Sequence, residues 1–156
     1  MVSDTHMPRG ARRLPDACLR ELERADLILH AGDFTAAGVL EDLRAFARVE
    51  GVHGNMDDGE LRALLPSRRV VEVAGHRIGM VHDPGPRAGR EARLAALFPD
   101  CKLLIYGHTH LPELVRRGSM QILNPGSPTE RRRAPAHTMA TITVSEARLD
   151  TNICSL

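Results

Sequence analysis

Five short apolar runs in this chain are each followed by residues of the kinds that bind metal ions. In chain order, the groups that follow the runs are Asp4-Thr5-His6, Gly32-Asp33, Gly54-Asn55, His82 and Gly107-His108-Thr109-His110. Short apolar runs of this kind are typical of buried strands. Open α/β sheets bind ligands outside the carboxyl ends of their strands. The series therefore predicts strands that deliver ligands to one edge of a sheet.

These residues supply two carboxylates, one amide oxygen and four imidazoles. That donor set is about enough for two divalent cations. No single motif is specific, because an isolated Asp-x-His, Gly-Asp or Gly-Asn occurs often in turns and helix caps. His108-Thr109-His110 is the strongest, because it brings two imidazoles close together. The order of all five groups, each after an apolar run, indicates a metal centre.

The length and composition fit a single soluble globular domain. At 156 residues we expect a single domain over 1–156, long enough to bury a core. Hydrophobic residues make up 42% and charged residues 26%, and the net charge is +1. This charge gives no signal for nucleic acid or for a membrane. With one Tyr and three Phe, the chain also lacks an aromatic platform for single strands.

Cysteine usage favours a reducing compartment, and the hydropathy pattern gives no membrane or secretion signal. Cys18, Cys101 and Cys154 are odd in number and form neither a C-x-x-C pair nor a disulfide framework. We therefore expect free thiols. No apolar run approaches the ~20 residues of a membrane helix, and no signal peptide is recognised. The expected location is the cytoplasm.

Periodicity and turn residues predict the elements. Helices are expected over 15–24, 36–47 and 90–98, and a short helical turn over 59–65. Strands are expected over 26–30, 48–52, 69–73, 77–81 and 103–106, and then over 113–117, 120–124, 139–144 and 148–154. The first strand has room only for Met1-Val2-Ser3. The pattern predicts an α/β (α+β) fold of mixed sheets covered by helices rather than one doubly wound sheet.

Taken together, the ordered motifs resemble the calcineurin-like metallophosphoesterase superfamily. The short length and the stretch Asn124-Pro125-Gly126-Ser127 resemble its small bacterial and archaeal phosphodiesterase branch. The resemblance covers Asp4 to about Arg133. It implies a four-layer β-sandwich, in which two mixed sheets are packed together and flanked by helices, with two metals at one edge.

The resemblance also implies roles for individual residues. The first metal is assigned to Asp4, His6 and His110, the second to Asn55, His82 and His108, and the bridge between them to Asp33. Asn55, His108 and Asp57 are assigned to the catalytic set, with Asp57 orienting a neighbour. Manganese is the expected metal, while iron, nickel and zinc stay open. The expected reaction is attack of a metal-bridging hydroxide on a small phosphoester.

Two positions depart from the family pattern. Many members have a histidine after Gly-Asn that protonates the leaving group, but this chain has Met56. A poor leaving group needs such an acid more than a good one, so we expect diesters rather than ordinary monoesters. His53 could replace the acid, or it could be a simple loop residue. Asp83 follows His82 where glycine is usual, which makes His82 the least secure ligand.

Two other functions stay open. One is a phosphomonoesterase of the same fold, and the other is a non-catalytic protein-interaction scaffold like the retromer subunit of this superfamily. All seven candidate ligands are present here, which favours the enzyme. The sequence does not single out a physiological substrate, and it leaves homo-oligomer formation open.

Overall fold

The computed structural model describes residues 1–156, and its elements lie close to those expected from the sequence. The helices are η1 (Arg9–Ala11), α1 (Asp16–Glu23), α2 (Ala37–Arg44), α3 (Gly59–Leu64) and α4 (Arg90–Leu97). The strands are β1 (Leu27–His30), β2 (Arg48–Gly51), β3 (Arg68–Val73), β4 (His76–Val81), β5 (Leu103–Ile105), β6 (Glu113–Arg117), β7 (Met120–Asn124), β8 (Thr138–Ser145) and β9 (Arg148–Ser155). Only the short η1 was not expected.

The strands form two layers. The first is one five-stranded sheet in the order β3-β4-β5-β7-β6, in which β4, β5 and β7 run parallel and the two outer pairs are antiparallel. The second contains the parallel pair β1-β2 and the antiparallel pair β8-β9. Both layers are therefore mixed, as the sequence predicted.

The chain start joins the two strand pairs of the second layer. Val2 donates to Leu29 O at 3.0 Å and accepts from Ala31 N at 3.1 Å, while Met1 O accepts from Ala140 N at 3.0 Å. The first strand is thus as short as expected, with Val2 forming only an isolated bridge to His30.

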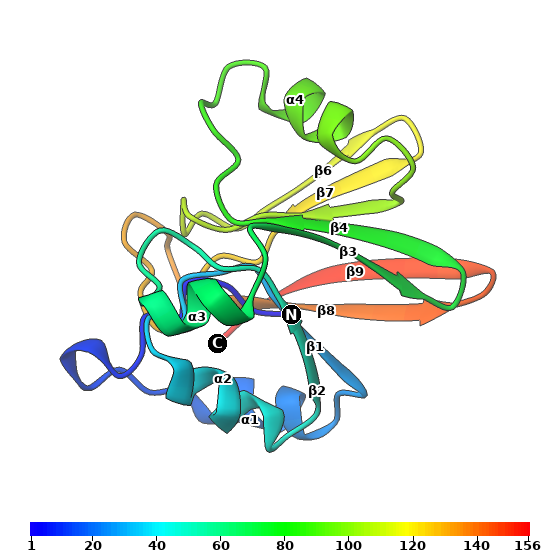
Figure 1. The fold of residues 1–156 in the computed structure, drawn as a ribbon. Coiled ribbons are helices and arrows are strands. Elements are labelled where there is room, and N and C mark those ends of the chain that lie inside the picture. The colour runs from blue at the N-terminus through cyan, green and yellow to red at the C-terminus, as the bar shows by residue number, and fades with distance from the viewer.

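Three apolar clusters separate four layers of structure. The central cluster joins the inward faces of the two strand layers, including Leu29 from β1 and Ile78 from β4. A second cluster packs Ile28 of β1 against α1, α2 and α3, and a third packs Leu104 of β5 against α4. Figure 1 shows α1 and α2 outside β1 and β2, and α4 outside the five-stranded sheet. This is the four-layer sandwich that the resemblance implied.

Alternation along the strands explains this layering. Ile28 and Leu29 of β1 point to opposite faces, so one packs against the helices and the other against the facing sheet. The helices bury the residues spaced along one face, such as Val39, Leu40 and Leu43 in α2. No helix has the length and hydropathy that crossing a lipid bilayer requires.

The strand ends that carry the polar series do not belong to a single sheet. Asp33 and Asn55 follow the parallel pair β1-β2, whereas His82 and His108 follow the parallel pair β4-β5 of the other layer. Our expectation of one sheet edge was incomplete, because the ligand-bearing edge is shared by two stacked sheets. The site therefore lies at the end of the central apolar cluster.

Candidate metal centre

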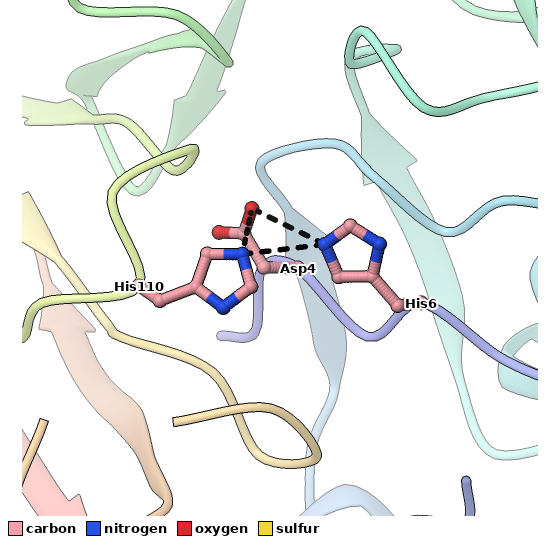
Figure 2. Close-up of side chains that lie close together, drawn as sticks. All are labelled: Asp4, His6 and His110. Carbon is pink, nitrogen blue, oxygen red and sulfur yellow. Dashed lines mark hydrogen bonds and ion pairs between the residues drawn. The ribbon is translucent and has the colours of Figure 1, made fainter. Parts of the chain in front are cut away.

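Asp4, His6 and His110, which we call the first group, lie together at this edge. The Nε2 atom of His110 lies 3.3 Å from both His6 Nε2 and Asp4 Oδ1, and His6 Nε2 lies 3.9 Å from Asp4 Oδ1. Figure 2 shows the three side chains pointing toward one another, with Asp4 and His6 on the N-terminal segment and His110 on a separate loop. All three are buried, with at most 2% of their surface exposed. Their donor atoms form one of two clusters in the structure suited to a metal ion.

Hydrogen bonds from distant parts of the chain hold the first group in place. Asp4 N donates to Gly32 O at 2.9 Å, and His6 N donates to Asp33 O at 3.0 Å. Ser3 Oγ donates to Asp4 Oδ2 at 2.6 Å, and Ser127 Oγ donates to Asp4 O at 2.7 Å. These bonds fix the Asp4 side chain and backbone from both sides before any ligand is bound.

The backbone of the site is unusual as well. Among the residues with positive φ are Asp4 (55°), His6 (45°), Asp33 (59°), His108 (68°) and His110 (59°). Positive φ is uncommon for residues other than glycine and persists only where the surroundings enforce it. The network around the site therefore holds these five side chains in orientations that an isolated loop would rarely adopt.

The second group is defined by Asn55, His82 and His108. Both histidine side chains approach the side-chain oxygen of Asn55. Asn55 Oδ1 lies 3.1 Å from His82 Nε2 and 2.9 Å from His108 Nδ1. His82 is buried, whereas His108 is half-buried and Asn55 is exposed. The second group is thus the open side of the site.

Asp33 lies between the two groups. Its Oδ2 atom is 3.6 Å from His6 Nε2 and 3.3 Å from His82 Nε2, while its Oδ1 accepts from Met56 N at 2.7 Å. Gly54 lies so close that an added Cβ would stand 2.1 Å from Asp33 Oδ1. Glycine at this position therefore allows the second loop to approach the shared carboxylate.

Asp57 binds backbone groups rather than the donor cluster. Its carboxylate accepts from Asp33 N at 3.1 Å, Gly54 N at 2.7 Å and Thr35 N at 2.7 Å. It joins the loop after β1 to the loop after β2, and the side chain is buried. This geometry suits the orienting role expected for it.

The histidine partners fix which ring nitrogen is free. His82 Nδ1 lies 2.8 Å from Ala31 O, and His110 Nδ1 lies 2.5 Å from Glu130 O. Because a carbonyl oxygen only accepts, each Nδ1 must carry the proton and donate. The Nε2 atoms are then free to bind a cation, which is the usual arrangement of metal-bound histidines.

The charges around the site favour a cation. Burial lowers the pKa of His6, so this imidazole is neutral near pH 7. Burial acts to raise the pKa of Asp33, but the hydrogen bond and charge of His82 outweigh it and lower the pKa. Burial acts to lower the pKa of His82, but Asp33 and Asp4 raise it. Protons and cations therefore compete for the pair formed by Asp33 and His82.

All seven predicted ligands meet at this site, and several residues besides Asp57 and Ser127 support it. Besides Ser3, these are Asn124, which donates to Gly107 O at 3.1 Å, and Glu130, with its Oε2 3.8 Å from His6 Nε2. Glu130 also pairs with Arg12 at 3.2 Å. Asn124 and Ser127 lie in the stretch that resembled a family loop, but no sequence pattern pointed to Ser3 or Glu130.

Two histidines outside the ligand set lie in different surroundings, one in the core and one at the open side of the site. His30 is fully buried beneath the first group, with Nδ1 accepting from Gly32 N at 3.1 Å and Nε2 lying 3.1 Å from Thr5 Oγ1. His30 is therefore a core histidine with both ring nitrogens satisfied. His53 lines a polar cavity with Asn55 and His82, so it is near the open side of the site.

Comparison with known proteins gives consistent matches. The family model described as the calcineurin-like phosphoesterase superfamily domain matches residues 1–147. A probable metallophosphoesterase of the archaeon Methanothermobacter thermautotrophicus is 39% identical over 131 residues, which cover 83% of this chain and 76% of the relative.

Solved structures support the same fold. A Thermotoga maritima protein solved by NMR has a TM-score of 0.78 and 30% identity, and the match covers 99% of this chain and 96% of that one. Vps29 from Entamoeba histolytica, solved with zinc, has a TM-score of 0.77 and 22% identity, covering 99% and 96% of the two chains. The Vps29 likeness concerns the fold alone. By its sequence and its fold, the chain belongs to the calcineurin-like phosphoesterase superfamily.

Proposed function

We propose that this protein is a phosphodiesterase that works with two divalent metal ions. The position of Asp33 is the observation that carries the proposal. Its Oδ2 atom is within 3.6 Å of a ligand nitrogen of the first group and within 3.3 Å of one in the second group. A carboxylate has the lone pairs to serve two cations at once. Asp4, of the first group, also lies within 4.8 Å of the donor atoms of Asp33 and His82.

The spacing of the donor atoms fits bound cations. Metal bonds to imidazole nitrogen and carboxylate oxygen are about 2.0–2.2 Å long, so ligands of one ion lie about 3–3.5 Å apart. Three donor pairs within the two groups fall in that range, at 3.1 to 3.3 Å, and the pair Asn55–His108 lies just below it at 2.9 Å. Hard oxygens combined with neutral imidazoles suit manganese, and also iron, nickel or zinc.

The chain's own residues prepare the site for substrate. Asp4 and Asp33 are buried carboxylates, and their two negative charges would only partly offset two divalent ions, so the loaded site would attract phosphate oxygens. When bound, the ions supply Lewis acidity and lower the pKa of coordinated water. Asn55 and His108 lie on the open side, where a substrate oxygen can approach, and Asp57 holds the backbone on which Asn55 and Asp33 depend.

Met56 favours diesters. Its backbone bonds to Asp33, while its side chain is 37% exposed and has no proton to donate. Activated or cyclic diesters have better leaving groups than ordinary monoesters, so they need less help from an acid. A phosphomonoesterase of the same fold is the second candidate.

A non-catalytic scaffold is the third candidate, and the fold likeness to Vps29 supports it. The complete donor set argues for the enzyme instead, because a binding surface gains nothing from seven converging donors, five of them in strained backbone. The physiological substrate, the metal and the cytoplasmic location stay predictions.

Hydrolysis of bis(4-nitrophenyl) phosphate tests the proposal. We expect metal-stripped protein to be inactive, and Mn²⁺ to restore activity as about two ions bind per chain, counted by mass spectrometry. Full activity without metal, or no activity after Mn²⁺ is bound, would contradict the enzyme. A protein that binds no metal would support the scaffold.

A further inference from the structure

A polar cavity adjoins the second group, and most of its lining residues are not among the predicted metal ligands. It has a volume of about 390 Å³, and only one of its nine lining residues, Val81, is hydrophobic. Asn55 and His82 form part of its wall, so it is continuous with the open side of the site. A volume of this size is within the range that small ligands occupy. The part of a substrate that extends past the second group would enter this cavity.

The charged groups of the cavity are mainly cationic. Arg62 and Arg68 both line it, and Arg68 is exposed and forms no ion pair. Asp83 is the only lining carboxylate, and its Oδ1 accepts from Gly85 N at 2.7 Å, which ties it to its own turn. With two arginines against one carboxylate, the charged lining residues leave the cavity with an excess of positive charge.

The two arginines differ in whether their guanidinium groups already bond to the protein. Arg62 donates from Nε to Asp57 O at 2.9 Å and from Nη2 to Asn55 O at 2.7 Å, so it supports the loop of the second group. Arg68, at the start of β3, has its whole guanidinium available. A guanidinium binds carboxylates and phosphates with two parallel hydrogen bonds. Arg68 is thus the residue best placed to recognise a ligand in the cavity.

We propose that this cavity binds a second anionic group of the substrate, with Arg68 as the specificity-determining residue. The inference rests on the proposed function and narrows it to phosphodiesters that carry a carboxylate or further phosphate beyond the scissile bond. An apolar substituent would leave the Arg68 guanidinium without a partner, and Val81 is the one hydrophobic side chain among the lining residues. The arginine side chains of the cavity hold the distal anion while the scissile phosphate reaches the donors around Asp33.

A matched pair of substrates tests this inference. 2-Carboxyethyl 4-nitrophenyl phosphate and 3-methylbutyl 4-nitrophenyl phosphate have the same leaving group and nearly the same shape, but only the first has a distal carboxylate. With Mn²⁺-loaded native protein we expect kcat/KM to be about tenfold higher for the carboxylate ester, as for one charge-assisted contact. The preference should shrink in 0.5 M NaCl, since salt screens exposed charges.

Two variants assign the preference to Arg68. R68A should lower kcat/KM about tenfold for the carboxylate ester and less than twofold for the 3-methylbutyl ester, and R68K should restore part of the loss. R117A is the matched control, because it removes an exposed arginine from the end of an edge strand, and it should change neither value.

The possible failures are distinguishable. If neither ester is hydrolysed, the proposed function is wrong and this inference falls with it. If native protein hydrolyses both esters equally, or if R68A lowers both alike, the inference is wrong and the phosphodiesterase assignment stands.

Discussion

The first and second groups have similar donors but very different surroundings. The first group is buried and tied down by bonds from four parts of the chain, including Ser3 and Ser127. The second group is open, contains the exposed Asn55, and adjoins a cationic cavity. Burial and fixed geometry favour tight ligand binding, whereas exposure allows exchange with solvent and substrate. The comparison indicates that the first group holds its metal and that the second group meets the substrate.

Replacement of Asp33 should have the largest effect, because it removes the residue on which the two groups converge. We expect D33N to lower kcat/KM for bis(4-nitrophenyl) phosphate by about 10²-fold or more and to weaken binding at both metal sites. Kinetics and metal titration measure the two effects. D42N, which makes the same change on the exposed face of α2, should alter neither. Loss of only one metal from D33N would show that Asp33 belongs to one group.

His108 and His110 lie on one loop but belong to different groups, so they allow the two groups to be compared directly. H110Q removes a buried ring that donates to Glu130 O, so we expect it to lower the free energy of unfolding by about 1–3 kcal/mol. H108Q, at a half-buried position, should change it by less than about 0.5 kcal/mol. Denaturant unfolding of metal-free protein measures both. Equal losses of stability would mean that burial does not distinguish the groups.

His30 tests whether the rigidity of the first group depends on the residues beneath it. H30Q should lower the free energy of unfolding at pH 7.5 by about 1–3 kcal/mol, because the buried bonds to Thr5 and Gly32 are lost. It should also weaken metal binding at the first group more than at the second. Unchanged affinity at the first group would show that its geometry is set elsewhere.

The same variant has an expected pH dependence. Burial holds the pKa of His30 well below its usual 6.5, so the unfolded chain takes up a proton that the folded protein refuses. The contribution of neutral His30 is therefore complete above pH 6.5 and declines as the pH falls below it. The difference in stability between native protein and H30Q should narrow from pH 7.5 to pH 5, measured by denaturant unfolding. If the difference in stability between native protein and H30Q is the same at both pH values, the lowered pKa of His30 does not contribute to stability.

The sequence predicted the convergence of the candidate ligands better than it predicted the residues that support them. Each ligand follows an apolar strand, and strand direction alone brings such residues to one edge, so local pattern was sufficient. Ser3 bonds to its chain neighbour Asp4, and no periodic pattern predicts this bond. Glu130 contacts His6, and Ser127 bonds to Asp4 O, across more than 100 residues of the chain. Local periodicity carries no information about such contacts.

The layering shows the same limit. Alternation correctly predicted the strands and mixed sheets, and the short first strand was read from Met1-Val2-Ser3. From periodicity alone, however, we expected one sheet edge, whereas two stacked sheets share the site. A strand buried on both faces reads the same in either sheet, because its side chains meet apolar partners on each side.

Met56 on the loop of the second group should give the smallest effect and the sharpest test of substrate preference. Its side chain is 37% exposed beside Asn55, on the side that we assign to the substrate. M56H should supply the missing acid and raise the ratio of monoesterase to diesterase activity by about threefold to tenfold, less than the full effect of an evolved general acid. Rates with 4-nitrophenyl phosphate and bis(4-nitrophenyl) phosphate measure the ratio, and M56Q, which is polar but cannot act as an acid near pH 7, should leave it unchanged. If M56H leaves the ratio where it is in the native protein, Met56 does not explain the preference for diesters. An equal rise in M56Q would instead assign the effect to polarity rather than to proton donation.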